Sequence, residues 1–441
     1  MTTSTSSLSK QYQKKTDKEH ILDAPDTYIG SIEMGEQNVN VMSCEGSISN
    51  ITSNNIIDGL YKIYDEAVVN SRDHATRTKG IKGNGNHPVS YIDIGITEEG
   101  VISIINDGNG IDVAEHPEHK LWIPEMIFGH LRTSTNYDKS EKKIVGGKNG
   151  FGVKLVFIWS EWGMVETVDH TRKLKYTQYF KENLDIIEKP KITKCTTKPY
   201  TKITFKPDYK RFGVKGLSTD MFTLFKRRVY DIAAVTDKSV KVKFNSQAVP
   251  IKNFAQYVEL YIGNDKEKVP RAGEEFDRWE YIVAVNHSDE FKQVSFVNGI
   301  YTSKGGKHVE YITNQIVKKL CSYINTKKKI DVKPSAIKEQ LTVFLKCDIE
   351  NPSFDSQTKD FMNTPSSKFG STCTVSDKLV EKLAKSGVMQ TACAISDAKD
   401  NKQAKKTDGS KSKTIRGIPK LVDANFAGTK KASSCSLIFC E

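Results

Sequence analysis

Four polar side chains gather on one face of a helix that the sequence predicts over residues 54–76. Apolar residues recur there at steps of three and four, which is typical of an amphipathic helix. The opposite arc, about 100° wide, holds Glu66, Asn70, Asp73 and His74. An asparagine oxygen is a hard ligand that suits Mg²⁺, and a glutamate one turn away can orient and deprotonate a water molecule. The alternative is an ordinary solvated helix face, the commoner meaning of so short a pattern.

Two glycine motifs follow the helix along the chain. Asn106-x-Gly108-x-Gly110 ends a predicted strand, and an asparagine amide can both donate to and accept from an adenine edge. A simple Asn/Gly turn is the alternative. Residues 146–154 predict a glycine loop that opens a helix and presents backbone N–H groups to an anion. The spacing is not that of a P-loop, because Val153 stands where lysine is required. Each motif alone is a weak signal.

The order of the three motifs raises their value. In this order the sequence resembles the GHKL ATPases and, much more closely, the type II DNA topoisomerases of eukaryotes and large DNA viruses. The resemblance runs through nearly the whole chain, including YQKKTDKEHILDAPDTYIGSIE (12–33), LYKIYDEAVVNSRDH (60–74) and IFGHLRTSTNYDKSEKKIVGGKNGFGVKL (127–155). It continues in RRVYDIAA (227–234), SFVNGIYTSKGGKHVEYI (295–312), NPSFDSQTKD (351–360) and RGIPKLVDANFAG (416–428). The expected fold is a GHKL (Bergerat) ATPase domain followed by an S5-like α/β transducer domain.

This resemblance implies a role for each matching position, with ATP and Mg²⁺ as cofactors. The general base matches Glu66, the Mg²⁺ ligand Asn70, and the adenine-reading residue Asn106. The segment that contacts sugar and phosphates matches Ser134, Thr135 and Asn136, and the phosphate lid matches Lys148, Asn149, Gly150, Phe151, Gly152 and Lys154. The loop that reaches the γ-phosphate from the second domain matches Gln357 and Lys359, and the strap residue that crosses to the partner subunit's nucleotide matches Tyr12.

Other matching positions concern DNA and metal. Lys327, Lys328 and Lys329 match a basic loop that faces DNA in the family, although a solvated helix end explains three lysines equally well. Glu441 matches the first acidic residue of the TOPRIM metal site and needs its companions to bind metal. His74 departs from the carboxamide or acid usual in relatives, and we interpret it as peripheral, with a titration near pH 6.5. The other histidines considered, His20, His116 and His308, have no companions at metal-ligand spacing and are interpreted as structural.

The elements that must position these residues divide into two folded units. The sequence predicts a hairpin of 89–96 with 101–105, strands at 201–206, 240–244, 280–286, 293–301 and 341–348, and a helix at 308–324. Strand–helix–strand alternation predicts a second α/β domain after about residue 246. The expected organisation is a flexible tail (1–11), the ATPase domain with its strap (12–245), the transducer (246–392), a basic linker (393–433) and the first strand of a TOPRIM domain (434–441).

Composition limits the functional classes. The 441 residues carry 66 Lys and Arg against 54 Asp and Glu, a net charge of +12, and residues 401–420 hold seven of the bases with Asp408 as their one acid. Such a stretch points to a nucleic-acid partner or to a solvated linker. No run approaches the roughly 18 apolar residues of a membrane span, and the Ser/Thr-rich start lacks a secretory signal core. The eight cysteines are scattered without a C-x-x-C pair, which argues against a zinc site and a disulfide framework and favours reduced thiols.

The expected function is ATP binding that dimerises a gate around a DNA duplex, with hydrolysis driving strand passage. The chain is expected to form a homodimer and to act inside the cell, in the nucleus or a viral replication compartment. It is expected to lack the DNA-cleavage machinery, which a deleted or separately encoded region supplies. One rival is a DNA-binding clamp with no useful ATPase. Another is a relative that keeps the fold with a different role, such as a histidine kinase, chaperone or mismatch-repair protein, which SQTKD and GIPKLVDAN disfavour.

Overall fold

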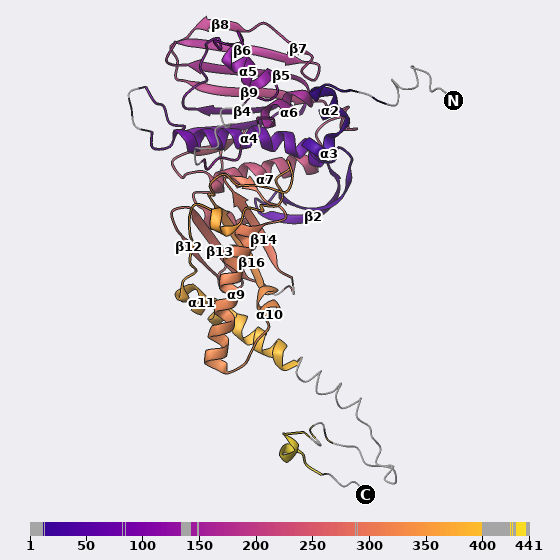
Figure 1. Cartoon of the computed structure of the whole chain (residues 1–441), viewed down its shortest axis with the longest axis vertical. Helices are drawn as coiled ribbons and strands as arrows, with labels where there is room; N and C mark the ends of the chain where they lie inside the picture. The colour runs from indigo at the N-terminus through magenta and orange to yellow at the C-terminus, as the bar shows by residue number, and fades with distance from the viewer. Residues whose placement is uncertain are drawn as a thin grey trace, which may run out of the picture.

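Two large sheets, which follow one another along the long axis of the molecule, organise the computed structural model, and a two-stranded sheet accompanies them (Figure 1). It describes residues 12, 14–81, 83, 85–133, 143–147, 150–286, 288, 290–398, 424, 426 and 429–437. The predicted site residues Ser134, Thr135, Asn136, Lys148, Asn149 and Glu441 lie outside these residues, as do the predicted tail and most of the predicted linker. We call residues 14–248 the N-terminal part and residues 254–398 the C-terminal part.

The N-terminal part contains a large mixed sheet and a separate hairpin. Within the described residues the sheet has nine strands in the order β11-β10-β3-β4-β9-β5-β6-β7, with β8 paired to β6. Its strands are β3 (Tyr91–Ile96), β4 (Ile102–Asp107), β5 (Ser160–Asp169), β6 (Leu174–Lys181), β7 (Ile186–Ile187), β8 (Lys191–Lys194), β9 (Tyr200–Pro207), β10 (Lys241–Phe244) and β11 (Gln247–Ala248). The hairpin pairs β1 (Gly35–Met42) with β2 (Ile48–Ile56). The predicted pairing of 89–96 with 101–105 is confirmed as β3 and β4.

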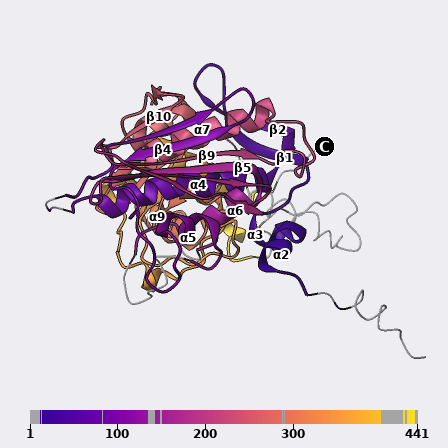
Figure 2. The same cartoon turned by 90° about the horizontal axis from the view of Figure 1, so that it is seen from above.

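The helix predicted over 54–76 is α4 (Asp58–Thr78), and it is buried on nearly all sides. Ile63 and Ala67 are fully buried, and α4 contacts β3 and β4 of the sheet. From the side of the C-terminal part α7 (Thr219–Val235) packs against α4, with Phe225 stacked on Tyr64. The short α6 (Gly152–Ile158) lies beside α4 (Figure 2). The remaining helices of this part are α2 (Asp17–Asp23), α3 (Pro25–Tyr28) and α5 (Ile123–Gly129). The solvated-face alternative for α4 is therefore wrong.

The C-terminal part is a five-stranded sheet covered by helices. The strand order is β12-β13-β16-β14-β15, formed by β12 (Arg271–Glu275), β13 (Trp279–Val285), β14 (Lys292–Val297), β15 (Ile300–Tyr301) and β16 (Leu341–Cys347). The single strand expected at 293–301 is in fact β14 and β15, because Asn298 and Gly299 have φ of 50° and 79° and reverse the chain. Its helices are α8 (Phe254–Ile262), α9 (Lys307–Lys328), α10 (Pro334–Lys338) and α11 (Asp377–Leu383).

The C-terminal helix predicted at 308–324 is confirmed, and the chain end needs correction. The predicted stripe of α9, which includes Ile312, Ile316 and Leu320, is fully buried. A π-type turn (Ala384–Val388) links α11 to a further helix that runs through residue 398, so the predicted linker starts in a helix. The predicted terminal strand is wrong over residues 434–437, because Ala432–Ser434 is a 3₁₀ turn and Leu437 is 71% exposed, with no described strand beside it to supply hydrogen bonds. Within the described residues, no helix has the length and apolarity to cross a membrane.

Candidate nucleotide-binding site

The centre of the site is the carboxylate of Glu66, which both parts of the molecule reach. Glu66 lies in the middle of α4 and is only 5% exposed. Lys62 Nζ lies 2.8 Å from its Oε1 and comes from the same helix one turn earlier. Lys359 Nζ donates to the same oxygen at 2.9 Å and comes from the loop after β16. Sequence positions 293 residues apart therefore meet in one buried ion cluster.

Electrostatics keep Glu66 ionised. Burial raises the pKa of this carboxyl, but the attraction of the Lys359 and Lys62 ammonium groups and their hydrogen bonds outweigh burial and lower the pKa to about 2. Burial likewise lowers the pKa of Lys359, and Glu66 reverses this so that the net shift is upward. The cluster carries two positive charges and one negative charge, so it has one cation to spare for an incoming anion.

The glycine loop ends where α6 begins, directly against Glu66. A Cβ atom on Gly152 would lie 2.0 Å from Glu66 Oε2, so only glycine permits this approach. Gly150 has φ of 70°, and Phe151 caps the helix with its ring 6.3 Å from that of Tyr28. The structure thus brings the loop and the base candidate together, as the sequence predicted for these described positions.

Lys154 is turned away from Glu66 in this structure. Its Nζ donates to the carbonyl of Thr133 at 2.6 Å, directly before the segment predicted to contact sugar and phosphates. Burial lowers the pKa of this ammonium group to about 8. It therefore anchors Thr133 here, and a phosphate contact through Lys154 stays a prediction.

The two candidate amides are held by backbone groups. Asn70 Nδ2 donates to the Glu66 carbonyl at 2.7 Å, and no described residue donates to its Oδ1. This arrangement fits a Mg²⁺ ligand, since the side-chain oxygen, the atom that Mg²⁺ prefers, accepts no hydrogen bond from the described residues. Asn106 is the last residue but one of β4, is buried, and donates through Nδ2 to the Asp107 carbonyl at 2.8 Å.

Of the other members of the predicted polar arc, Asp73 is buried and His74 is partly buried. Asp73 accepts from the N–H groups of Gly146 and Gly147, each at 2.9 Å, so it fixes the start of the glycine loop. Burial is the main cause of the raised pKa of Asp73. Burial also lowers the pKa of His74 to about 4, with help from Arg77. The titration near pH 6.5 expected for His74 is therefore wrong.

The sequence reasoning missed three partners in this region. Lys62 also donates to the Thr358 carbonyl at 3.3 Å, so it ties α4 to the loop that carries Gln357 and Lys359. Its spacing of four residues from Glu66 was a usable signal. Buried Asp65 pairs with Arg228 of α7 at 2.6 Å, and no local pattern in the sequence announces that long-range contact.

The remaining predicted residues lie away from Glu66. Tyr12 is 73% exposed. Lys327 and Lys328 end α9, and Lys329 follows in the left-handed conformation with φ of 58°; all three are exposed. Among the structural histidines, His308 is fully buried beside Thr302, and burial lowers its pKa to about 3.

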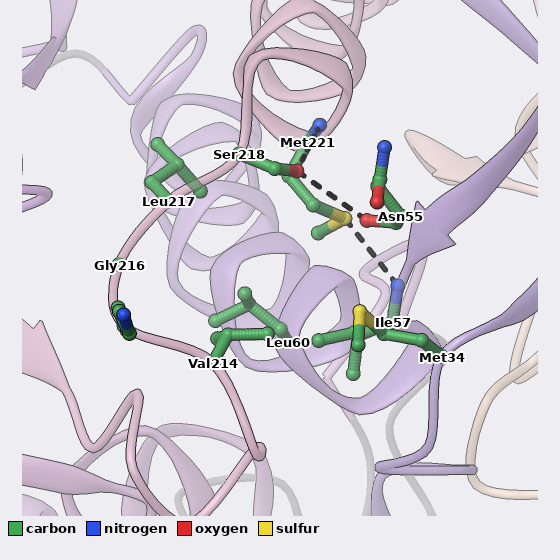
Figure 3. A pocket seen from close by; sticks show the side chains of 10 residues that line it. Met34, Asn55, Ile57, Leu60, Val214, Gly216, Leu217, Ser218 and Met221 are labelled. Carbon is green, nitrogen blue, oxygen red and sulfur yellow. Dashed lines mark hydrogen bonds between the residues drawn. The ribbon is translucent and has the colours of Figure 1, made fainter.

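A cavity of about 350 Å³ opens elsewhere, between the N-terminal ends of α4 and α7 (Figure 3). Its walls include Ile57, Leu60 and Met221, and the Ile57 N–H donates to the Met221 sulfur at 3.5 Å. No predicted site residue lines this cavity. The candidate site is therefore defined by the converging charged groups around Glu66.

Comparison with known proteins identifies the family of this chain. Residues 55–211 match the family model of histidine kinase-, DNA gyrase B- and HSP90-like ATPases, and residues 253–413 match that of DNA gyrase B. DNA topoisomerase 2 of Arabidopsis thaliana is 42% identical over 98% of this chain and 29% of its own length. The mimivirus DNA topoisomerase 2 is 42% identical over 99% of this chain and 34% of its own length. The chain thus spans about a third of these relatives.

Solved structures match over their full length. The ATPase region of Saccharomyces cerevisiae topoisomerase II bound to ICRF-187 is 41% identical, with a TM-score of 0.81 over 88% of this chain and 100% of that one. The ATPase and transducer domains of Balamuthia mandrillaris topoisomerase II are 36% identical, with a TM-score of 0.83 over 89% of this chain and 99% of that one. Fold, site and sequence converge: the chain belongs to the type II DNA topoisomerase family and corresponds to its ATPase and transducer region.

Proposed function

We propose that this chain binds Mg·ATP and hydrolyses it as the ATPase region of a type II DNA topoisomerase. One observation carries the proposal: a buried carboxylate against a glycine loop is held by a lysine from the C-terminal part, Lys359, across 2.9 Å. Two lysines share this one carboxylate, so the cluster has a net positive charge. Such a charge favours the binding of a phosphate group. Membership of the ATPase family supports this assignment.

The ion cluster makes the site inactive until a nucleotide arrives. A carboxylate with a pKa of about 2 is a weak base while both ammonium groups hold it. The γ-phosphate of ATP competes with Glu66 for Lys359, and ADP offers no such group. Once Lys359 moves to the phosphate, Glu66 accepts a proton from the attacking water, whose oxygen bonds to the γ-phosphorus while the bond to the ADP oxygen breaks.

Asn70 and Asn106 complete the proposed site. Asn70 would hold Mg²⁺ through Oδ1, and the ion would neutralise phosphate charge when bound. Asn106 would read the adenine edge through its amide. The contacts implied for Ser134, Thr135, Asn136, Lys148 and Asn149 remain predictions for residues outside the described part of the chain.

The test of the base is Glu66→Gln, with Glu66→Ala as a second variant. Both should bind a Mg·ATP analogue in calorimetry, and turnover should fall roughly 10²–10⁴-fold, the usual contribution of a positioned acid or base. Turnover near the wild-type value would exclude Glu66 as the base. Absence of any binding heat for the wild-type chain would exclude the nucleotide site itself.

The test of the switch is Lys359→Ala. It should lower hydrolysis and spare ADP affinity, because only ATP carries the group that Lys359 is proposed to meet. Lys346→Ala is the control, since Lys346 also pairs with a glutamate, Glu280, at 2.7 Å, but within the C-terminal part. Equal losses of ATP and ADP affinity in Lys359→Ala would make this lysine a general binding residue.

The roles that depend on partners are proposed from the family alone. ATP is proposed to dimerise two copies through the strap with Tyr12 around a DNA duplex that meets Lys327–Lys329, inside a nucleus or viral replication compartment. A TOPRIM and cleavage region, in which Glu441 would bind metal, is proposed to act with this part. Deleting residues 1–20 should abolish nucleotide-dependent dimers in ultracentrifugation, and unchanged dimers would contradict the strap's role.

A further inference from the structure

The turn between β14 and β15 inserts a buried asparagine between the two parts of the molecule. Asn298 is fully buried and has φ of 50°. Its Oδ1 accepts from the Ile349 N–H at 2.8 Å, and its Nδ2 donates to the Ile349 carbonyl at 2.9 Å. The same Nδ2 donates at 3.2 Å to the carbonyl of Val145, which begins the glycine loop of the N-terminal part. One amide group thus joins β14, the segment after β16, and the loop.

The start of the glycine loop is held from two sides. On the side of the C-terminal part, the Asn351 N–H donates to the Lys143 carbonyl at 2.9 Å, next to the Asn298 contact with Val145. On the side of α4, Asp73 accepts from Gly146 and Gly147. This set of hydrogen bonds fixes the position and the direction of the backbone where it enters the loop.

Close packing at Gly146 leaves no room for a side chain there. A Cβ atom there would lie 2.9 Å from Val69 of α4 and 3.0 Å from Ile300, the first residue of β15 after the turn. Gly299 is equally close to its neighbour, since a Cβ atom on it would lie 2.8 Å from the Arg72 side chain. The turn is therefore wedged against α4 beside the loop, and a shift of the turn must displace the loop.

The segment after β16 reaches Glu66 as well as the loop. Asp348 pairs with Arg72 of α4 at 2.9 Å, and Lys359, eleven residues further along, pairs with Glu66. The contacts of Ile349 and Asn351 lie between these two ion pairs. The glycine loop and Lys359 are thus attached to one stretch of the C-terminal part.

We propose that Asn298 is a positioning residue for nucleotide binding, which sets where the glycine loop lies relative to Glu66. It acts through Val145 and does not touch the reacting groups. The inference rests on the proposed function, because the loop matters only if it contacts a nucleotide. Its consequence is that ATP affinity depends on a side chain of the C-terminal part other than Lys359.

The test is Asn298→Asp, which keeps the size and the acceptor but turns Nδ2 into an oxygen facing two carbonyls. The KM for ATP should rise about 10-fold with kcat within about 3-fold, because misplaced binding groups cost uniform binding while Glu66 and Lys359 are unchanged. Hydrogen exchange at the Gly146 and Gly147 amides should accelerate, a readout that needs no nucleotide.

Asn245→Asp is the matched control. Asn245 also sits in a two-residue β-turn with positive φ, of 47°, and its amide binds the N–H of Ile96 at 2.8 Å and its carbonyl at 3.3 Å. That turn joins β10 to β11 at the edge of the large sheet, on the opposite side from β5 and β6. Asn245 is exposed, unlike Asn298, so its variant controls for the change of amide to acid in such a turn. It should keep the wild-type KM and the wild-type exchange at Gly146.

Gly146→Ala is the second variant, for use if Asn298→Asp does not fold. The added methyl group forces Val69 and Ile300 apart and should raise KM in the same way. A normal KM with normal amide exchange in the folded variants would overturn the proposal, as would an equal rise in KM for Asn245→Asp. If wild-type chain fails to bind nucleotide, the proposed function fails; unchanged Gly146 and Gly147 exchange in Asn298→Asp would separately refute the positioning role.

Discussion

Two adjacent residues of α4 enter two buried charge clusters of opposite design. The Glu66 cluster consists of Glu66, Lys62 and Lys359, with both lysines on one carboxylate oxygen. The Asp65 cluster consists of Asp65, Arg227, Arg228 and Asp231, with pairs at 2.6 and 2.7 Å. The first has two cations for one anion, whereas the second has two of each.

The partners of the Asp65 cluster show what the imbalance means. Arg228 also donates to the Gly299 carbonyl, and Tyr257 donates to Asp231, so several elements close the network. Buried charges persist when they are paired, and both arginines of this cluster pair with a carboxylate that belongs to it. The Glu66 cluster keeps a surplus cation on a loop residue with φ of 65°, Lys359. The balanced cluster has an anion for each cation, and the unbalanced one is prepared to exchange a partner.

The largest loss of unfolding free energy should come from removing one carboxylate from the Asp65 cluster. Asp65→Asn leaves the guanidinium of Arg228 buried without its anion, which should lower the free energy of unfolding by about 3–5 kcal/mol. Glu66→Gln should cost less, because a buried lysine that loses its anion can give up its proton, whereas an arginine cannot. Denaturant unfolding of both variants measures the difference. Equal losses of unfolding free energy would show that the two clusters stabilise the fold equally.

Acid should separate the Glu66 cluster from its neighbour His74. Burial and Arg77 lower the pKa of His74 from 6.5 to about 4, while the Asn109 backbone and Asp107 oppose this. The unfolded chain then binds the extra proton, so stability falls as pH drops from 6.5 to 4, by roughly 3 kcal/mol at full titration. Glu66, with a pKa lowered from 4.5 to about 2, loses its contribution only below pH 4.5.

His74→Gln should therefore remove part of the first stage and leave the second. Unfolding free energies measured from pH 7 down to pH 3 give the two slopes. The second stage should shrink in Glu66→Gln instead. A His74→Gln curve that matches the wild type between pH 6.5 and 4 would contradict a neutral, buried imidazole.

Patterns local in sequence predicted the elements, and contacts distant in sequence decided the site. The period of three and four placed α4 and α9, and alternation placed β3 and β4, because each pattern reports burial of one face. The same reasoning could not foresee that the polar arc of α4 is buried, since the covering groups, Lys359 and Gly152, lie far along the chain. It missed the β14–β15 break because Asn298-Gly299 sits inside an otherwise apolar run.

The family resemblance and the geometry inform different parts of the site. The resemblance named Glu66, Asn70 and Lys359, and the structure shows that Glu66 and Lys359 form an ion pair. Neither spacing nor resemblance assigned Lys62 or Asp73, although each stands one turn from a named residue on α4. On a buried helix every face contacts other residues, so residues one turn from a site residue also contact the site.

A smaller effect should follow from crowding the Glu66 cluster. Gly152→Ala would place a methyl carbon 2.0 Å from Glu66 Oε2, so the carboxylate must turn and loosen its lysine contacts. The expected loss of unfolding free energy is about 1–3 kcal/mol, the usual range for overpacking. Gly35→Ala is the control, because no atom lies within 4 Å of a Cβ there. A neutral Gly152→Ala would mean that Glu66 has room to move, and the contrast with the rigid Asp65 cluster would grow.

The smallest effect should come from the edge of the Asp65 cluster. The Arg227 guanidinium lies 4.4 Å from the centre of the Tyr301 ring, a contact that adds to its ion pair with Asp231. Tyr301→Leu should cost about 1 kcal/mol, since cation–π contacts are worth roughly that much, and Tyr301→Phe should be close to neutral because the ring remains. Thermal unfolding of the two variants isolates the ring. If Tyr301→Leu cost as much as Asp65→Asn, the ring and not the paired carboxylates would be stabilising the buried arginines, and charge balance would no longer distinguish the two clusters.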